Sequence, residues 1–489
     1  MKAEIELKLD VAPAAIATIL AHPVIAGRRP VTRDQLSTYF DTGQRNGAGA
    51  PLSLRVRRIG DRFVQTMKAA SATLPGLFVR DEWEKEIAGE EPDLSGMPPG
   101  FARFLDGVDG AIGLRPLFAT HVRRTTITCE VEQSRIEIAV DSGHVAAGGR
   151  KAAISEIELE LLDGEPRSLF TLARELRRAV PVRLGVRSKQ ERGYALLDGR
   201  RGRAIKAEPV MLVEEMSAAD AFAAITVACL RHFRLNEDLV LARGKAEPLH
   251  QARVALRRLR SALSIFKHML AGAELARFRG ELNWLSGLFG AVRDIDVLIG
   301  RIADETALDR LRVERGRCHA MLVEALDGRR ARDLVIDIAE WGMAGSWRHA
   351  ADVDMRKRPA REAADDILRR LRRHLRRGDG DLREMDDERR HDIRIAAKKL
   401  RYASEFFARL YPGDKARRRH GHMLARLEDL QTALGDLNDL ATARALLTGL
   451  GIADAGGLLS RDPETDAASH LANAAQAYAG LLDARKFWD

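Results

Sequence analysis

The chain has 489 residues, more than one hydrophobic core usually supports, so two or three domains are expected. Its net charge of +9 favours an acidic partner, while aromatic residues make up only 5% and argue against a base-stacking platform for single-stranded nucleic acid. The three cysteines have no CxxC pairing, the N-terminus lacks the apolar core of a signal peptide, and no apolar run could cross a bilayer. These features exclude a disulfide framework and favour a cytoplasmic protein.

Residues 1–200 are expected to form an α+β domain made mainly of short strands. Runs in which polar and apolar residues alternate, such as 4–9, 54–57 and 156–161, are separated by Gly, Pro and Asp. Helical periodicity appears at residues 166–180, and a shorter helix is expected near residues 12–21.

The polar positions of these strands carry charges in blocks. The first and last runs contribute mostly acids and the middle run cations, namely Glu4 and Glu6 with Lys8, then Arg55 and Arg57, then Glu156, Glu158 and Glu160. A solvated sheet face explains any one of these strands taken alone. Together the blocks suit a complex of a divalent metal with a polyphosphate, because carboxylates bind the metal and Arg and Lys bind phosphate oxygens. A closed barrel with a charged lumen would gather them around one ligand.

These residues resemble the CYTH family, the triphosphate tunnel metalloenzymes. The segment EIELK at residues 4–8 resembles the ExExK motif of that family. The resemblance continues in the family's order through YFDT, LRVRR, QTMK, RDEWE, RPLFATHVRR, IEIAVDSG, SEIELEL and RSKQERGY, over about the first 200 residues. It implies an antiparallel β-tunnel of about eight strands with flanking helices, which holds a triphosphate together with Mg²⁺ or Mn²⁺.

The resemblance also assigns roles to individual residues. The expected metal ligands are Glu4, Glu6, Asp141 and two of the three glutamates of the last run, where we favour Glu156 and Glu158 and keep Glu160 as the alternative. The expected phosphate-binding cations are Lys8, Arg55, Arg57, Lys68, Arg123 and Lys189. Tyr39 and Lys68 resemble a pair that orients or activates the attacking water in some relatives. The implied activity is hydrolysis of inorganic triphosphate, or of a related short polyphosphate or organic triphosphate.

From about Ala207 the sequence becomes helical, with apolar residues at spacings of three and four. We expect a CYTH-like domain over residues 1–200, a polar linker over 201–212 and an all-α domain over 213–489. The helical domain should consist of two duplicated bundles, about 213–350 and 355–489. Gly290 and Asp294 recur as Gly435 and Asp439 within the second copy.

One basic pattern appears in both copies with identical spacing, 141 residues apart. It comprises His250, Arg253, Arg257 and Arg260, which recur as His391, Arg394, Lys398 and Arg401. Offsets of 0, 3, 7 and 10 residues fall within roughly 80° of one helix face, so each copy points its charges in one direction. Arg258 and Lys399 point away from this face and are expected to pair with acids. Two such faces favour a phosphate polymer as ligand.

A second basic run, at residues 367–377, stays open between contact with a polyanion, contact with membrane lipids and a solvated face. The helical half as a whole resembles the CHAD domain, a basic helical module associated with polyphosphate binding. This resemblance implies that inorganic polyphosphate is a partner and that the protein associates with polyphosphate granules. A non-catalytic granule-targeting protein and a class IV-type adenylate cyclase are the alternatives. Nucleic acid ranks below them because the chain lacks base-reading motifs.

Overall fold

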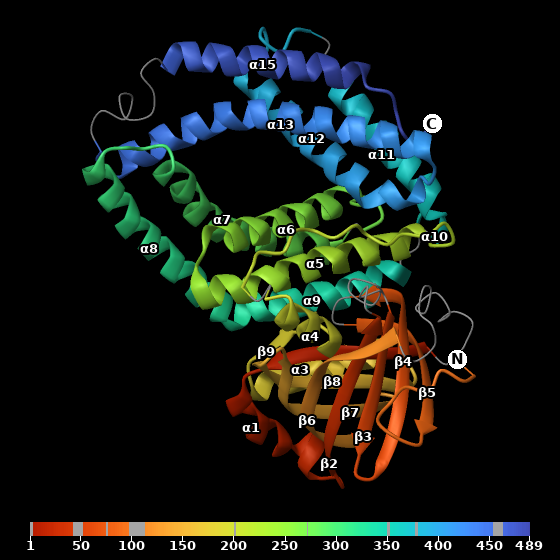
Figure 1. Cartoon of the computed structure of the whole chain (residues 1–489). Coiled ribbons are helices and arrows are strands. Elements are labelled where there is room, and N and C mark those ends of the chain that lie inside the picture. The colour runs from red at the N-terminus through yellow and green to blue at the C-terminus, as the bar shows by residue number, and fades with distance from the viewer. Residues whose placement is uncertain are drawn as a thin grey trace. The chain divides into compact units, whose positions relative to one another are not determined.

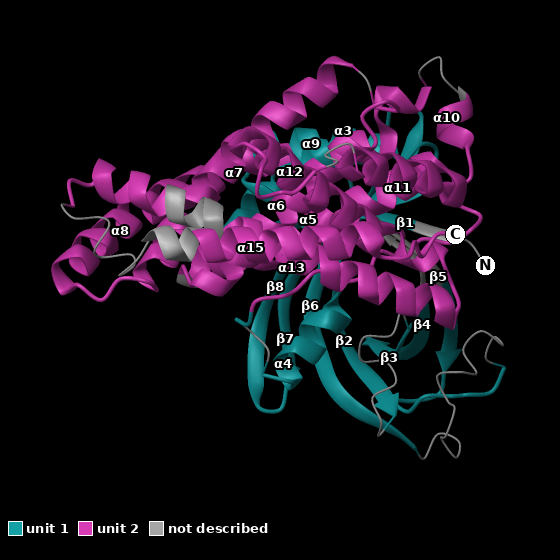
Figure 2. Ribbon diagram, turned by 90° about the horizontal axis from the view of Figure 1, so that it is seen from above, with its two compact units in different colours: residues 1–203, 335–340 teal, residues 204–334, 341–489 magenta. Residues whose placement is uncertain are grey.

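The computed structural model describes residues 3–42, 52–74, 77–96, 113–199, 202–270, 272–349, 353–376, 380–452 and 463–489. Within these ranges the side chains of residues 3–4, 69–74, 77–81, 243, 353, 436–441 and 463–467 are not described. The chain divides into two compact units, Met1–Arg203 with Val335–Glu340, and Ala204–Leu334 with Trp341–Asp489 (Figure 2). Among helices in the described ranges, none is both long and apolar enough to cross a membrane.

The first unit contains an antiparallel β-barrel (Figure 1). Its strands are β1 (Ala3–Val11), β2 (Val31–Thr42), β3 (Leu52–Ile59), β4 (Arg62–Leu74), β5 (Leu77–Ile87), β6 (Leu114–Val131), β7 (Ser134–Ala147), β8 (Arg150–Asp163) and β9 (Val182–Leu184). They pair in the order β5-β4-β3-β2-β6-β7-β8-β1-β9. Because β1 also pairs with β5, the first eight strands close on themselves and β9 extends β1. The expected antiparallel tunnel is confirmed.

The helices of this unit are η1 (Pro13–Ala15), α1 (Ile16–Leu20), α2 (Pro23–Ala26), α3 (Arg167–Ala179) and α4 (Lys189–Leu197). Helix α3 packs on β1, β6 and β8 through an apolar face that includes Leu169, Leu172 and Leu176. In β8, Ile157 and Leu159 are fully buried and alternate with Glu156 and Glu158. Since the apolar positions face the covering helices, the acids face the lumen. The barrel therefore has its apolar layer outside and its charges inside.

The second unit is all-helical, as expected. Its elements are α5 (Ala218–Arg243), α6 (Ala246–Ile265), α7 (Ala273–Ile299), α8 (Glu305–Asp327), α9 (Arg329–Ala344), η4 (Ser346–His349), α10 (Val353–Lys357), α11 (Ala360–Arg376), α12 (Asp387–Phe407), η5 (Ala408–Leu410), α13 (Asp414–Gly449) and α15 (Pro463–Asp483). The middle of α9, Val335–Glu340, is assigned to the first unit. Helices α5 to α8 pack in sequence, and so do α11, α12, α13 and α15 (Figure 1). Contacts of α6 with α12 and of α5 with α11 join the two groups. The repeated basic pattern lies on α6 and α12.

Part of the basic run at residues 367–377 has a structural role. Arg372, which is buried, donates to the carbonyls of Leu482 and Ala484 at 2.9 and 2.6 Å. Arg370 donates to the carbonyl of Ile265 at 2.9 Å. These carbonyls lie at the ends of α15 and α6, where backbone acceptors have no partner within the helix and the helix dipole is negative. These two arginines therefore stabilise helix ends.

Candidate functional site

Acidic side chains of the barrel lumen gather on β7 and β8. The pairing of these strands places Asp141 opposite Glu156, and Glu158 follows two residues later on the same face. One carboxylate oxygen from each residue lies within 4.8 Å of the others. All three residues are at most 9% exposed. Oxygen ligands at this spacing fit a hard divalent cation such as Mg²⁺ or Mn²⁺, so these three residues, called here the carboxylate trio, can hold the implied metal.

Two lysine ammonium groups lie among these carboxylates. Lys189 Nζ is 2.7 Å from Asp141, 2.6 Å from Glu156 and 2.8 Å from Glu158. Lys8 Nζ is 2.5 Å from Glu158 and 3.5 Å from Glu156. The structure thus brings together three of the expected metal ligands and two of the expected phosphate-binding cations.

The cations keep these buried carboxyl groups ionised. Burial would raise the pKa of Glu158, but Lys189, Lys8 and Arg124 hold it well below its ordinary value. Against the same effect of burial, Lys189 and Arg124 lower the pKa of Asp141. Burial alone would lower the pKa of Lys8 and of Lys189, yet the surrounding carboxylates raise both. Acids and ammonium groups are therefore all charged at neutral pH.

Arg124 takes the lumen position expected of Arg123. The pairing of β6 with β7 sets Arg124 opposite Asp141. Its Nε and Nη2 atoms donate to the two oxygens of Asp141 at 2.7 and 2.6 Å, and it also donates to Glu158. The side chain of Arg123 is 69% exposed and lies 3.2 Å from Asp34. Adjacent residues of a strand face opposite sides of the sheet, so the expectation for Arg123 is wrong by one residue.

The expected metal ligands of β1 and the third glutamate of β8 do not belong to the carboxylate trio. Glu6 is 6% exposed, lies 4.0 Å from Lys8 Nζ and is opposite Glu160 in the β1–β8 register. Glu160 is not a member of the carboxylate trio. The side chain of Glu4 lies outside the described residues, so its metal role stays a prediction.

Another part of the barrel wall is basic. The register of β2 with β3 sets Tyr39 opposite Arg55 and Ser37 opposite Arg57, and Arg57 Nε donates to Ser37 Oγ at 3.2 Å. Both arginines are among the expected phosphate-binding residues.

Lys68, on β4, belongs to the same wall. Its Nζ lies 3.2 Å from Glu82 on β5, and an Nη2 atom of Arg55 lies 3.8 Å from the same carboxylate. Glu82 thereby links two of the expected phosphate-binding cations.

Positive charges on this wall crowd one another. Burial, together with Arg55 and Arg124, lowers the pKa of Arg57 to about 9. Burial would raise the pKa of Tyr39, but the charges of Arg55, Lys189 and Arg57 bring it below its ordinary value. Both shifts include the effect of neighbouring cations, and an anionic ligand beside Arg57 would favour its charged form.

Helix α4 is held against the barrel from its first turn. Ser188 Oγ accepts from the amide of Glu191 at 3.1 Å, and Glu191 Oε2 accepts from the amide of Ser188 at 2.7 Å. This capping box fixes the turn that carries Lys189. Gly193 lets the helix approach β6, because a Cβ at that position would lie 2.2 Å from the ring of Phe118.

Other side chains of α4 contact β1, β2 and β3. The contacts are Arg192 with Asp10 at 2.7 Å, Tyr194 with Asp41, and Gln190 with the carbonyl of Leu52 at 2.9 Å. Together with Lys189, which reaches β7 and β8, they place α4 at one end of the lumen as a plug.

Four charged residues near the lumen ligands were not among the expected site residues: Arg124, Glu82, Glu137 and Arg192. Glu137 lies on the same face of β7 as Asp141, four residues away, so strand alternation alone identifies it. Arg192 follows Lys189 by three residues, which is the spacing of one helix face. Helical spacing in the segment RSKQERGY is thus the sequence feature that points to Arg192.

The second unit contains a basic cavity of about 940 Å³. Helices α6, α7, α12 and α13 contribute to its lining, together with the segment before α5. Among its described lining residues, nine are lysines or arginines and four are acids. The cations are Lys206, Arg253, Arg257, Arg258, Arg293, Arg301, Arg394, Lys398 and Arg401. An excess of five positive charges in one cavity favours a polyanion as occupant.

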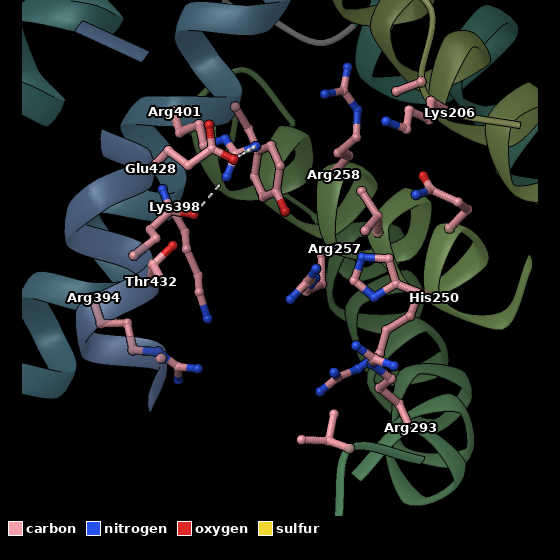
Figure 3. A pocket seen from close by; sticks show the side chains of 18 of the residues that line it. Lys206, His250, Arg257, Arg258, Arg293, Arg394, Lys398, Arg401, Glu428 and Thr432 are labelled. Carbon is pink, nitrogen blue, oxygen red and sulfur yellow. Dashed lines mark hydrogen bonds and ion pairs between the residues drawn. The ribbon is translucent and has the colours of Figure 1, made fainter. Parts of the chain in front are cut away.

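The cations of α6 and α7 face those of α12 across this cavity. Figure 3 shows Arg257, Arg293 and His250 on one side and Arg394 and Lys398 on the other. Of the described groups, His250 Nδ1 and Arg257 Nε are buried without a hydrogen-bond partner. Burial and the charges of Arg293 and Arg257 lower the pKa of His250. Buried N–H donors without partners, such as Arg257 Nε, are rare, and a phosphate oxygen would provide an acceptor; a protonated His250 would add donors.

The cavity does not use the two copies of the basic pattern equally. The residues of α6 at offsets 0, 3 and 7 line it, namely His250, Arg253 and Arg257. On α12 the residues at offsets 3, 7 and 10 do so, namely Arg394, Lys398 and Arg401. Arg260 and His391, at the remaining offsets, are exposed and do not appear among its described lining residues. The four positions of the pattern span roughly 80° of each helix, with offsets 0 and 10 at its two edges. On α6 the edge at offset 0 lines the cavity, and on α12 the edge at offset 10 does. Direct contact of Arg260 and His391 with a ligand in this cavity is therefore not supported.

Arg258 pairs with an acid, as its position on the helix predicts. It is 5% exposed, donates to Glu405, and its guanidinium lies 4.8 Å from the ring centroid of Phe406. Asp294, a repeated position, lies 3.8 Å from Arg253 and pairs with the basic group. The side chain of Asp439 lies outside the described residues.

Comparisons with known proteins divide the chain between residues 194 and 224, the range that contains the boundary between the two compact units at Arg203 and Ala204. The family model described as the CYTH domain matches residues 2–194, and the model described as the CHAD domain matches residues 224–448. A Haemophilus influenzae protein named inorganic triphosphatase is 31% identical over 206 residues, which are 40% of this chain and 55% of that protein. The chain thus spans about half the length of this relative.

Two solved structures are also similar. The CHAD domain from the plant Ricinus communis is 28% identical, with a TM-score of 0.47, and the match covers 57% of this chain and 97% of that one. A Hippeastrum protein considered an adenylyl cyclase, with a dominant triphosphatase activity, is 22% identical, with a TM-score of 0.33, and covers 40% of this chain and 96% of its own.

The charged barrel lies within the residues that the first family model matches, and most of the helices around the basic cavity lie within those that the second matches. The chain therefore has the CYTH–CHAD architecture, with an N-terminal CYTH domain followed by a CHAD domain.

Proposed function

We propose that the CYTH domain hydrolyses inorganic triphosphate, or a related short polyphosphate, with the help of a divalent metal. The observation that carries this proposal is the division of one closed barrel into a carboxylate trio and a wall of crowded cations. The first can hold a metal and the second offers several cations to phosphate oxygens. The name of the Haemophilus influenzae relative supports the same activity.

The reaction is the attack of water on a terminal phosphorus, which breaks the bond to the bridging oxygen and yields pyrophosphate and phosphate. A divalent metal bound to the carboxylate trio would neutralise phosphate oxygens and stabilise the charge of the leaving group. Arg55, Arg57 and Lys68 would hold the phosphate chain in line. Tyr39, whose pKa lies below its ordinary value, would orient the water or accept its proton.

Phosphate release by the full-length protein tests this activity. Triphosphate, longer polyphosphate chains, ATP and thiamine triphosphate would be compared with Mg²⁺, with Mn²⁺ and with EDTA. We expect metal-dependent release of phosphate from triphosphate. The absence of release with either metal would refute the proposal and leave a polyphosphate-binding protein without catalysis.

Two variants test the expected roles of Glu6 in metal binding and of Arg55 in phosphate binding. Glu6→Ala should abolish turnover while the protein stays folded, and Arg55→Ala should mainly raise the apparent KM. Arg58→Ala is the matched control, because Arg58 lies on the same strand with its side chain exposed. Near-normal activity of Glu6→Ala, or an unchanged KM for Arg55→Ala, would contradict the assigned roles.

We further propose that the CHAD cavity binds inorganic polyphosphate and can bring the protein to polyphosphate granules. The excess of cations and the buried Arg257 Nε without a hydrogen-bond partner support this proposal. Labelled polyphosphate would be titrated with full-length protein in EDTA, which suppresses hydrolysis, and competed with RNA of equal charge. Stronger competition by RNA would favour a nucleic-acid ligand instead.

A further inference from the structure

Lys189 occupies the place where a metal would sit. Its ammonium nitrogen is within 2.8 Å of one oxygen from each member of the carboxylate trio. A divalent metal would need the same three oxygens at about 2.0–2.2 Å, so ammonium and metal cannot occupy this position together. The first turn of α4, fixed by its capping box, supplies the lysine, while β7 and β8 supply the acids.

The carboxylate trio already has cationic partners within the chain itself. The three acids of the carboxylate trio meet three cations, Lys8, Lys189 and Arg124, at hydrogen-bonding distances. Lys8 and Lys189 are at most 8% exposed, so water screens this cluster poorly. Adding a dication alone would bring positive charge close to these three cations in a buried space, which is unfavourable. Adding it together with a phosphate chain would offset this charge, because Lys189 can then pair with phosphate oxygens.

We propose that Lys189 is an internal counter-cation that keeps the metal site closed until a phosphate ligand draws its ammonium group away. Metal and triphosphate then bind with positive coupling, since each removes the obstacle to the other. Lys189 is a positioning residue for the metal in addition to its expected phosphate contact. This inference rests on the proposed metal-dependent hydrolysis and concerns its order of binding.

The packing around the lumen holds Lys8 in place, so the exchange is assigned to Lys189. The stem of Lys8 is held closely, because a Cβ at Gly185 would lie 2.6 Å from its Cγ and the amide of Gly185 donates to its carbonyl at 2.8 Å. Lys189 lies at the start of helix α4. Its ammonium group is also close enough to the basic wall to lower the pKa of Tyr39 together with Arg55 and Arg57.

Titration of the metal-free full-length protein with Mn²⁺ in phosphate-free buffer tests this inference. Free Mn²⁺ would be followed by its electron paramagnetic resonance signal. Lys189→Gln should bind Mn²⁺ about 5- to 150-fold more tightly than the wild type, which is the usual range of a coupling between sites. Arg192→Gln is the matched control: it also removes one positive charge next to Glu156, 3.2 Å away, but this arginine does not bridge the carboxylate trio.

A second titration adds imidotriphosphate, a triphosphate analogue that resists hydrolysis. After Mn²⁺ bound by the analogue alone is accounted for, the analogue should strengthen Mn²⁺ binding by the wild type. The same gain in Mn²⁺ affinity should be smaller for Lys189→Gln. If Lys189→Gln fails to fold, Lys189→Met, which removes the charge and keeps all three carboxylates, takes its place and should also lose the coupling.

Equal Mn²⁺ affinities of wild type and Lys189→Gln, or an equal gain in Arg192→Gln, would overturn the role of Lys189 while metal-dependent hydrolysis still stands. If neither protein binds Mn²⁺ even with imidotriphosphate, both the metal site and this inference are wrong.

Discussion

Arg123 and Arg124 are neighbours on β6 that serve opposite sides of the barrel wall. Arg124 bonds to both oxygens of Asp141 in the lumen, while Arg123 lies at the surface, 3.2 Å from Asp34. Two identical side chains one residue apart thus offer an internal control for the lumen. Of these two arginines, only Arg124 should affect properties that depend on the charge of the lumen.

Replacement of Arg124 by Gln should raise the apparent KM for triphosphate about 10- to 100-fold, because a hydrogen bond to a charged group contributes about 1.5–3 kcal/mol. Arg123→Gln should leave KM within about twofold of the wild type, since exposed ion pairs contribute little. Initial-rate kinetics would measure both variants, and urea unfolding would show that both are folded. A larger change in Arg123→Gln than in Arg124→Gln would place the wrong arginine in the lumen.

Tyr39→Phe should change how catalysis depends on pH. Nearby cations bring the pKa of Tyr39 below 10.0, so its ionised fraction grows as the pH approaches that value from neutrality. If the phenolate accepts a proton from water, kcat/KM of the wild type rises with pH in this range, and the Phe variant lacks that rise. The profile of kcat/KM from pH 7 to 10 checks this, because substrate ionisation affects both proteins alike. An identical alkaline rise in both would remove Tyr39 from the proton transfer.

Neutralising two cations that face each other across the CHAD cavity should weaken polyphosphate binding. In the double variant Arg257→Gln with Lys398→Gln, we expect the slope of log K against log salt to fall by about 0.7 for each lost contact, the value for single-stranded polyanions. Arg260→Gln is the control, because this exposed arginine shares helix α6 but does not appear among the described lining residues. Anisotropy titrations at several salt concentrations give the slopes. A control that weakens binding as much as the double variant would contradict the cavity as the site.

Polyphosphate binding should become stronger as the pH falls through the range where His250 titrates. Burial and neighbouring cations lower the pKa of His250 in the free protein, so it is neutral at pH 7. A bound polyanion adds negative charge, raises this pKa and favours protonation, and binding then takes up protons. His250→Gln should lose most of this uptake.

His391→Gln is the control for this proton uptake. His391 is exposed and holds the equivalent place in the second copy of the pattern, so its replacement should leave the uptake unchanged. Calorimetry in buffers of different ionisation enthalpy measures the protons taken up. Undiminished uptake in His250→Gln would assign it to another group, with His420, which also lines the cavity, as the next to replace.

Strand alternation and helix periodicity were sufficient to predict the two kinds of domain and the charge blocks at their functional faces. The acids of β8 and the cations of β3 appear on one face each because side chains alternate along a strand. The resemblance assigned the phosphate role to Arg123, but its motif contains two adjacent arginines and does not say which of them faces the lumen. Only the pairing of β6 with β7 decides which of them meets Asp141.

The sequence by itself determined which residues carry charge and with what spacing, since these follow from local periodicity: a strand that is acidic on one face, and two helices that each bear a basic stripe. Which charges meet was decided only by the tertiary structure, because pairing across the barrel and between helices joins residues far apart in the chain. Lys189 reaches Asp141 because helix α4 packs against β7 and β8. His250 lines the cavity and His391 does not, because α6 and α12 turn different parts of their basic stripes toward it. Local patterns carry no information about such long-range contacts.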